Sequence, residues 1–271
     1  MALVDSKIHL DGLYGKIPMT KIDFTKLVIP AEKTVGVGGG AYQTELIQTS
    51  GVTSVKDTNP KDAVGIKKVP FSTIPYPPIT EVMDRLEDYH QYPFPYQVLS
   101  QLGVAMLEGA RKYGRHNYRV AGVRASVYFD AFMRHVAFGF LTGEDIDVES
   151  GLSHITKAIA TLVVFQDAVA NDKWVDDRPP LTHLSLDIDT LDVNLLDLNI
   201  RELVETALNI MTVWWENGDN KLLVEATAFL FAAQDKIMDI DDQSLLWRTN
   251  LQTKVDEIFQ RHPVAKEAFT K

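Results

Sequence analysis

Carboxylates gather in one short segment of the chain, residues 143–151. Glu144, Asp145, Asp147 and Glu149 lie there within a span of six residues. Hard cations such as Mg²⁺ bind carboxylate oxygens, usually together with substrate phosphates and water. The segment therefore has two interpretations: a metal site, or a solvated acidic turn whose carboxylates favour the N-terminus of the following helix. Spacing alone favours the acidic turn.

Two histidines, His135 and His154, flank this acidic segment. A helical hairpin would place them close together, near Asp130 and Glu108. Histidine binds metals, transfers protons and donates hydrogen bonds, so the pair is a candidate for chemistry, and a structural pair is the alternative. Two spacings of four residues also fit ordinary ion pairs within a helix, namely Asp130 with Arg134 and Glu108 with Lys112.

A basic segment, residues 111–124, locally reverses the sign of the charge in an acidic chain. Arg and Lys side chains bind phosphate oxygens, and aromatic rings between them would stack on a base. The alternative is a solvated helix end, where the helix dipole favours cations. The cations are Arg111, Lys112, Arg115, Arg119 and Arg124, and Tyr113, His116, Asn117 and Tyr118 lie between them.

Composition excludes several classes of protein. The 271 residues include 27 Lys or Arg and 37 Asp or Glu, for a formal net charge of −10. An acidic chain lacks the basic surface that a nucleic-acid polymer requires of its partner. The absence of cysteine excludes disulfides, thiolate zinc sites and cysteine nucleophiles. No apolar run is long enough for a membrane helix, and the N-terminus lacks signal-peptide features, so we expect a cytoplasmic protein without a membrane partner.

Hydrophobic periodicity predicts an all-α protein. Helices are expected over a segment that contains Val98–Ala110 and ends near Gly114, over Ser126–Thr142 with Ser126 as N-cap, and from Ser153 onward. Further helices are expected at about 200–217, 221–239 and 243–261. Four prolines within residues 70–78 predict an extended connection in the segment 56–80. Pro179–Pro180 mark a boundary, which gives three regions: an irregular arm at 1–55, a domain at 56–180 and a helical region at 181–271.

Three weaker signals have simple structural interpretations. The glycines of residues 36–40 fit a dinucleotide-binding pattern only loosely and are interpreted as a loop. Trp214–Trp215 are interpreted as a core or oligomer contact. Glu202, Glu205 and Glu225 form an incomplete version of a paired carboxylate motif and are interpreted as surface charge.

Several ordered segments resemble the bacteriophage dATP/dGTP diphosphohydrolase family, which is related to MazG-like enzymes. They cover about residues 56–180 and are Asn59–Ala63, Lys112–Gly114, Asn117–Tyr128, Asp130 to Arg134-His135, Gly143–Asp147, Ser150-Gly151, His154 and Asp176–Pro179. The resemblance implies a helical MazG-like pyrophosphohydrolase core. It also implies metal-dependent hydrolysis of dGTP or dATP to monophosphate and pyrophosphate, and a homo-oligomer. In phages that replace adenine with 2-aminoadenine, such enzymes supply dGMP and deplete dATP, so a phage-encoded protein would act in the host cytoplasm.

The resemblance also suggests roles for the residues above. Mg²⁺, with Mn²⁺ or Co²⁺ as substitutes, would be bound by Glu108, Glu144 and Asp147. The catalytic set would be Asp130, His135 and His154, with Asp130 as a further metal ligand. The nucleotide would contact Lys61, Lys112, Tyr113, Arg115, Asn117, Arg119, Arg124 and Arg134. The Glu-x-x-Glu and Glu-x-x-Asp signature of MazG-like enzymes is not intact here.

Two other functions remain open at this point. An HD-type phosphohydrolase would release nucleoside and tripolyphosphate, but the doublet here is Arg134-His135 and not His-Asp. A non-catalytic phage protein that binds nucleotides, or that has a structural role, would be compatible with the same residues.

Overall fold

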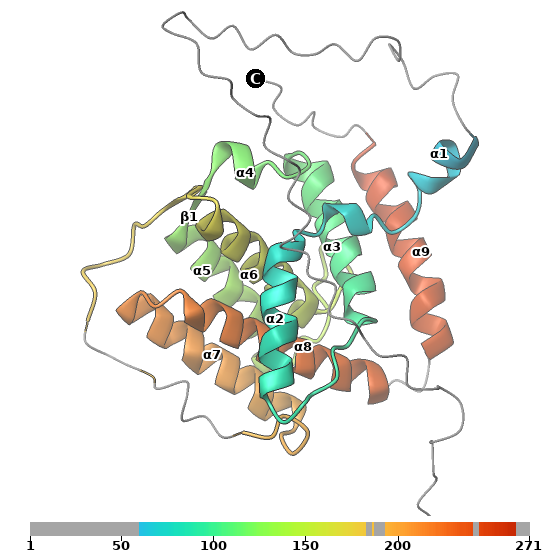
Figure 1. Cartoon of the computed structure of the whole chain (residues 1–271). Helices are drawn as coiled ribbons and strands as arrows, with labels where there is room; N and C mark the ends of the chain where they lie inside the picture. The colour runs from blue at the N-terminus through green and yellow to red at the C-terminus, as the bar shows by residue number, and fades with distance from the viewer. Residues whose placement is uncertain (1–59, 183–185, 187–192, 241–243, 264–271) are drawn as a thin grey trace, which may run out of the picture. The chain divides into compact units, whose positions relative to one another are not determined.

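The computed structural model describes residues 60–182, 186, 193–240 and 244–263 (Figure 1). Helices dominate this part of the chain, and its strands are limited to one parallel pair, β1 (Val123–Arg124) and β2 (Trp174–Val175). The prediction of an all-α fold is confirmed. The expected arm at 1–55 and the glycine segment 36–40 lie outside the described residues.

The described helices follow one another along the chain with short connections. The α-helices are α1 (Pro60–Gly65), α2 (Tyr76–Asp88), α3 (Val98–Tyr113), α4 (Tyr118–Ala121), α5 (Ala125–Val136), α6 (His154–Ala170), α7 (Ile200–Asn217), α8 (Lys221–Ile240) and α9 (Ser244–Arg261). Two short 3₁₀ helices are η3 (Phe71–Thr73) and η4 (Phe140–Thr142).

Capping residues explain several of these boundaries. Gly114 ends α3 with a positive φ of 100°, a conformation that glycine adopts without strain. Ser153 caps α6, because its side chain accepts a hydrogen bond from the backbone N–H of Ile155. Asn199 and Glu202 form a capping box at the start of α7. The predicted helices that begin or end at these caps are confirmed.

Two predicted boundaries are wrong. Helix α5 ends at Val136 and not at Thr142, because the chain turns at Gly139, where a side chain would collide with His154. Ser126 is not its N-cap: the N–H and hydroxyl groups of Ser126 donate to Asp177.

The proline-rich segment also contains more helix than expected. Helix α2 begins at Tyr76 and includes Pro77 and Pro78 in its first turn. Proline is tolerated there because the first N–H groups of a helix have no partner within the helix. The prediction of an extended connection over 56–80 is therefore wrong at α1 (Pro60–Gly65), at η3 (Phe71–Thr73) and from Tyr76 onward.

One hydrophobic core joins α2, α3, α5, α6, α7 and α8. The fully buried Trp214 of α7 packs edge-on against Phe165 of α6, with ring centroids 5.3 Å apart. This confirms the core interpretation of Trp214. Helix α9 packs on α3 through a smaller cluster that includes Val104, Leu107, Val255 and Ile258. Helices α7 and α8 thus share their core with the helices of residues 56–180.

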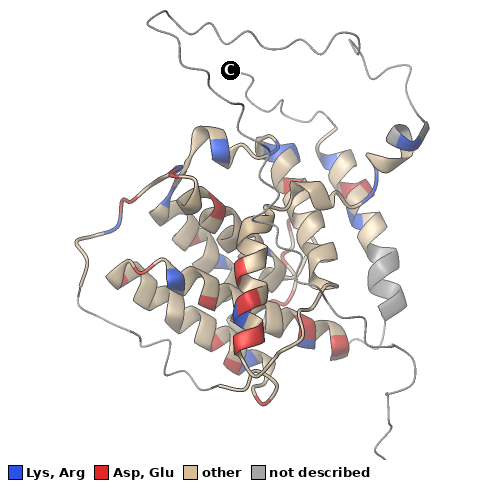
Figure 2. Ribbon diagram, viewed as in Figure 1, with Lys and Arg blue, Asp and Glu red and all other residues tan. Residues whose placement is uncertain are grey.

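The charge of the protein is spread unevenly over these helices. Figure 2 shows acidic residues along α2, where Glu81, Asp84, Glu87 and Asp88 are exposed. In the described part of the chain, no helix is long and apolar enough to cross a membrane.

Glu225 on α8 is not a surface charge, so that interpretation is wrong. Its side chain is buried against α2, where Arg85 Nε lies 2.5 Å from Oε1 and the hydroxyl of Tyr89 donates to Oε2 at 2.6 Å. A carboxylate can be buried there because both of its oxygens have partners. Sequence periodicity placed Glu225 on a helix but could not show that the helix buries this face.

We expect Glu225→Ala to lower the free energy of unfolding by about 3 kcal/mol, because the partly buried guanidinium of Arg85 loses its buried counter-ion and keeps only the exposed Asp88, at 3.5 Å. Urea unfolding followed by circular dichroism measures this change. The matched control is Glu205→Ala, whose exposed pair with Arg201 should contribute at most about 1 kcal/mol. Equal losses in the two variants would contradict the assigned role of Glu225.

Candidate active site

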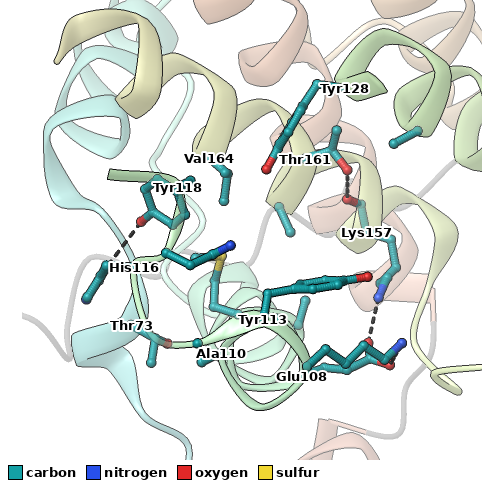
Figure 3. Close-up of a pocket in the computed structure, with 18 of the residues that line it drawn as sticks. Thr73, Glu108, Ala110, Tyr113, His116, Tyr118, Tyr128, Lys157, Thr161 and Val164 are labelled. Carbon is teal, nitrogen blue, oxygen red and sulfur yellow. Dashed lines mark hydrogen bonds and ion pairs between the residues drawn. The ribbon is translucent and has the colours of Figure 1, made fainter. Parts of the chain in front are cut away.

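A cavity of about 240 Å³ lies between α3, α5 and α6, and it contains several of the residues selected from the sequence (Figure 3). Its walls combine apolar groups, such as Met106, Ala131 and Val164, with ionisable and aromatic ones. The polar and aromatic lining residues are Thr73, Glu108, Lys112, Tyr113, His116, Asn117, Tyr118, Tyr128, His135, Lys157 and Thr161.

The buried carboxylate of Glu108 lies between two ammonium groups. Its Oε2 atom accepts a hydrogen bond from Lys157 Nζ at 2.6 Å, and its Oε1 atom forms an ion pair with Lys112 Nζ at 2.9 Å. Burial raises the pKa of Glu108, but the two lysines outweigh it, so the pKa is lowered. Glu108 is therefore ionised at neutral pH. Its Oε1 atom is buried and accepts no hydrogen bond.

The two histidines meet beside this cavity. Their Nδ1 atoms lie 3.0 Å apart, so one ring donates and the other accepts. His154 Nε2 is buried without a hydrogen-bond partner and lies 3.6 Å from Glu144 Oε2. Burial, together with the positive charge of Lys157 and the nearby His154 ring, lowers the pKa of His135 to about 4. His135, which lines the cavity, is therefore neutral near pH 7 and can accept a proton.

The acidic segment forms an internally bonded loop. Asp147 Oδ2 accepts hydrogen bonds from both the N–H and the hydroxyl of Ser150, which lower the pKa of Asp147 although burial opposes them. Glu149 pairs with Lys112 at 2.5 Å, and Glu144 remains largely exposed. Among the described residues, no group of three or more acidic or histidine side chains is arranged to bind a metal ion. Glu108, Glu144 and Asp147 are thus not assembled into one site.

Some side chains of the basic segment line the cavity, and others are bound to carboxylates outside it. Lys112, Tyr113 and Asn117 line the cavity. Arg119 forms two hydrogen bonds, of 2.7 and 2.6 Å, with the fully buried carboxylate of Asp167. Arg124 lies 3.7 Å from Asp177.

The remaining selected residues lie outside this cavity. Arg115 donates to the carbonyl of Ser72, Asp130 and Arg134 are exposed on α5, and Lys61 is exposed on α1. None of these four is part of the cavity lining.

Sequence reasoning missed four of these polar and aromatic lining residues, Thr73, Tyr128, Lys157 and Thr161. Lys157 had a recognisable signal, because it is the single basic residue of α6, a helix that is otherwise largely apolar. It also lies three residues after His154, which places both on the same helix face.

A second cavity, of about 430 Å³, lies on the α9 side of α3 and includes Arg111 and Arg115 in its lining. Arg111 already donates to the backbone carbonyl of His262 at 2.7 Å and lies over the ring of Phe259. The lining contains no carboxylate and no histidine. Although it is the larger cavity, it lacks the groups that acid–base chemistry needs, so we assign the site to the first one.

The lowered pKa of His135 predicts a pH dependence of stability. Between about pH 6.5, the ordinary pKa of histidine, and about pH 4, the unfolded chain takes up a proton at this position that the folded chain does not. His135 therefore lowers the free energy of unfolding as the pH falls through this window. NMR titration, with His135→Gln to assign the signal, should give a pKa well below 6. A value of 6 or above would contradict the burial of a neutral ring.

Comparison with known protein families gives a match over part of the chain. Residues 58–178, a little under half of the chain, match the family model described as dATP/dGTP diphosphohydrolase, N-terminal. No curated protein and no solved structure matches the chain. The matched segment contains α3, α5 and α6, whose side chains form the first cavity. This segment of the chain is therefore similar to the N-terminal part of the dATP/dGTP diphosphohydrolases, which are hydrolases that act on nucleoside triphosphates.

Proposed function

We propose that the cavity between α3, α5 and α6 hydrolyses dGTP and dATP to the monophosphate and pyrophosphate. The observation that carries this proposal is the presence, in one cavity, of two ammonium groups for phosphate and a neutral histidine for water. The family match supplies the class of substrate.

The phosphates bind at the charged end of the cavity. Lys112 offers an ammonium group there, and its other partners, Glu108 and Glu149, keep it in place. A cavity of about 240 Å³ is smaller than most ligand pockets, which measure about 300–1,000 Å³. Part of the nucleotide therefore lies at the mouth, where Tyr113 is 58% exposed and offers a ring to the base. Asn117 adds an amide that can bond the base edge or the sugar.

His135 acts as the general base in this proposal. The oxygen of a water attacks the α-phosphorus and loses a proton to the neutral imidazole, and the bond from the α-phosphorus to the bridging oxygen breaks as pyrophosphate leaves. His154 fixes the orientation of His135 through the contact of their Nδ1 atoms. Glu144 Oε2 lies 3.6 Å from the far nitrogen of His154, where its negative charge would stabilise a proton on that ring.

We further propose that the reaction requires Mg²⁺, which Mn²⁺ or Co²⁺ can replace. Of the three predicted ligands only Glu108 lines the cavity, where its Oε1 atom is ion-paired with Lys112 Nζ at 2.9 Å. Magnesium commonly binds one or two carboxylates together with substrate phosphates, so Glu108 fits an ion that arrives with the nucleotide. When bound, the ion would offset the charge that develops on the phosphates. Glu144 and Asp147 do not bind the metal in this proposal. Glu144 lies beside His154, and Asp147 accepts hydrogen bonds from Ser150 within the acidic loop.

The physiological role is part of the same proposal. A phage-encoded enzyme of this kind would act in the host cytoplasm on a small-molecule substrate and would lower the dATP pool. It would also supply dGMP as a precursor of the 2-aminoadenine nucleotide. We propose that it works as a homo-oligomer, in line with the MazG-like enzymes that the sequence resembles.

The test is product analysis with each deoxynucleoside triphosphate and Mg²⁺, resolved by anion exchange. Wild-type protein should release monophosphate and pyrophosphate from dGTP or dATP. His135→Gln should lower kcat by about 10²- to 10⁴-fold, the usual contribution of a general base, without loss of helical circular dichroism. His262→Gln, outside the cavity, is the matched control.

Two outcomes would contradict the proposal. Release of nucleoside and tripolyphosphate would identify an HD-type reaction. Full turnover by His135→Gln would remove this residue from the mechanism.

A further inference from the structure

We infer that Lys157 is a substrate-binding residue whose ammonium group contacts the triphosphate, and that Glu108 positions it. This inference rests on the proposed function, since it concerns the same cavity. Neither the resemblance nor the family match assigns a role to this lysine.

The geometry of α6 places Lys157 at the cavity. Its side chain is 18% exposed, and its Nζ atom donates to Glu108 Oε2 at 2.6 Å across the space between α6 and α3. Figure 3 shows the two side chains facing each other at one end of the cavity, away from His116 and Tyr118. The backbone beneath Lys157 is regular, because its carbonyl accepts a hydrogen bond from the Thr161 hydroxyl one turn later.

The ammonium group of Lys157 shares its carboxylate with a second lysine. Lys112 and Lys157 both pair with Glu108. Lys112 has a second acidic partner in Glu149, whereas the ion pair of Lys157 in the described structure is with Glu108 alone. An ammonium group has three N–H donors, so Lys157 can donate to a phosphate oxygen while it keeps its bond to Glu108.

The position of Lys157 also suits the reaction. It lies one helical turn after His154, which contacts the proposed general base, His135. Lys112 reaches the same carboxylate from the opposite wall, on α3. The two ammonium groups, from two different helices, therefore lie on either side of the Glu108 carboxylate, at the end of the cavity where the phosphates would bind. An ammonium acts as a point charge and needs no fixed angle to a phosphate oxygen.

A purely structural role is the alternative, in which Lys157 only neutralises Glu108. The two roles predict different effects of substituting Lys157 on the binding of separate parts of the substrate. If Lys157 binds phosphate, its substitution weakens the binding of ligands that carry phosphates and leaves the affinity for the nucleoside unchanged. If Lys157 only supports the fold, its substitution changes the affinity for both ligands equally, or for neither.

The experiment is isothermal titration calorimetry of the full chain with inorganic tripolyphosphate and, separately, with deoxyguanosine, in Mg²⁺-free buffer. We expect Lys157→Ala to weaken tripolyphosphate binding at least about tenfold, since a charge-assisted hydrogen bond contributes that much or more. Deoxyguanosine should bind with unchanged affinity. Lys157→Arg, which keeps the charge, should recover most of the tripolyphosphate affinity, and Lys173→Ala, at an exposed position, should bind as wild type does.

If Lys157→Ala does not fold, the double variant Glu108→Gln with Lys157→Gln takes its place. The double variant removes the buried carboxylate of Glu108 together with its lysine partner, so no buried carboxylate is left unpaired. It should also lose tripolyphosphate affinity while it keeps deoxyguanosine affinity. Unchanged tripolyphosphate binding, or equal weakening of both ligands in a folded variant, would overturn the inference. Turnover of dGTP by the wild-type protein reports on the proposed function separately, so the two can fail independently.

Discussion

The candidate site depends on one buried carboxylate, that of Glu108, held between the ammonium groups of Lys112 and Lys157. A carboxylate in such a place is tolerated only because both of its neighbours are cations. Those cations in turn stay inside the cavity, and do not extend into water, because the carboxylate binds them. The result is a cavity that presents two ammonium groups at one end, within a chain whose formal net charge is −10. An acidic protein needs such local cations in order to bind a triphosphate.

Helix α6 connects this charge to the core. One face packs Ile155, Ile159 and Leu162 into the interior, where they are buried. Another face presents His154 and Lys157 to the site. The rigidity of a packed core therefore fixes the position of the chemical groups, which catalysis requires to within a fraction of an ångström. Gly139 allows the close approach of His135 and His154, because any side chain there would occupy the place of the His154 ring.

Much of the fold could be predicted from the sequence, because the helices have regular apolar periods and clear end signals. Helix α3 ends before Gly114, as that glycine indicated, and α7 begins at Ile200, where the apolar period returns. The end of α5 was predicted too late, because the apolar residues continue past Val136 into the separate short helix η4.

The site was predicted only in part. Sequence patterns identified Glu108, Lys112 and the histidine pair, whose residue types suggest chemistry directly. They could not show that Arg119 is bound to the buried Asp167, because burial of a carboxylate leaves no trace in residue type. Lys157 was missed because a single lysine in an apolar helix resembles a surface residue until its neighbours are known.

The central claim is that the nucleotide binds between α3, α5 and α6. A crystal structure with Mg²⁺ and a dGTP analogue that carries a non-hydrolysable α,β-imido bridge tests this claim most directly. The account predicts phosphate oxygens within hydrogen-bond distance of Lys112 and Lys157, with His135 facing the α-phosphorus. An analogue bound instead in the second cavity, on Arg111 and Arg115, would contradict it.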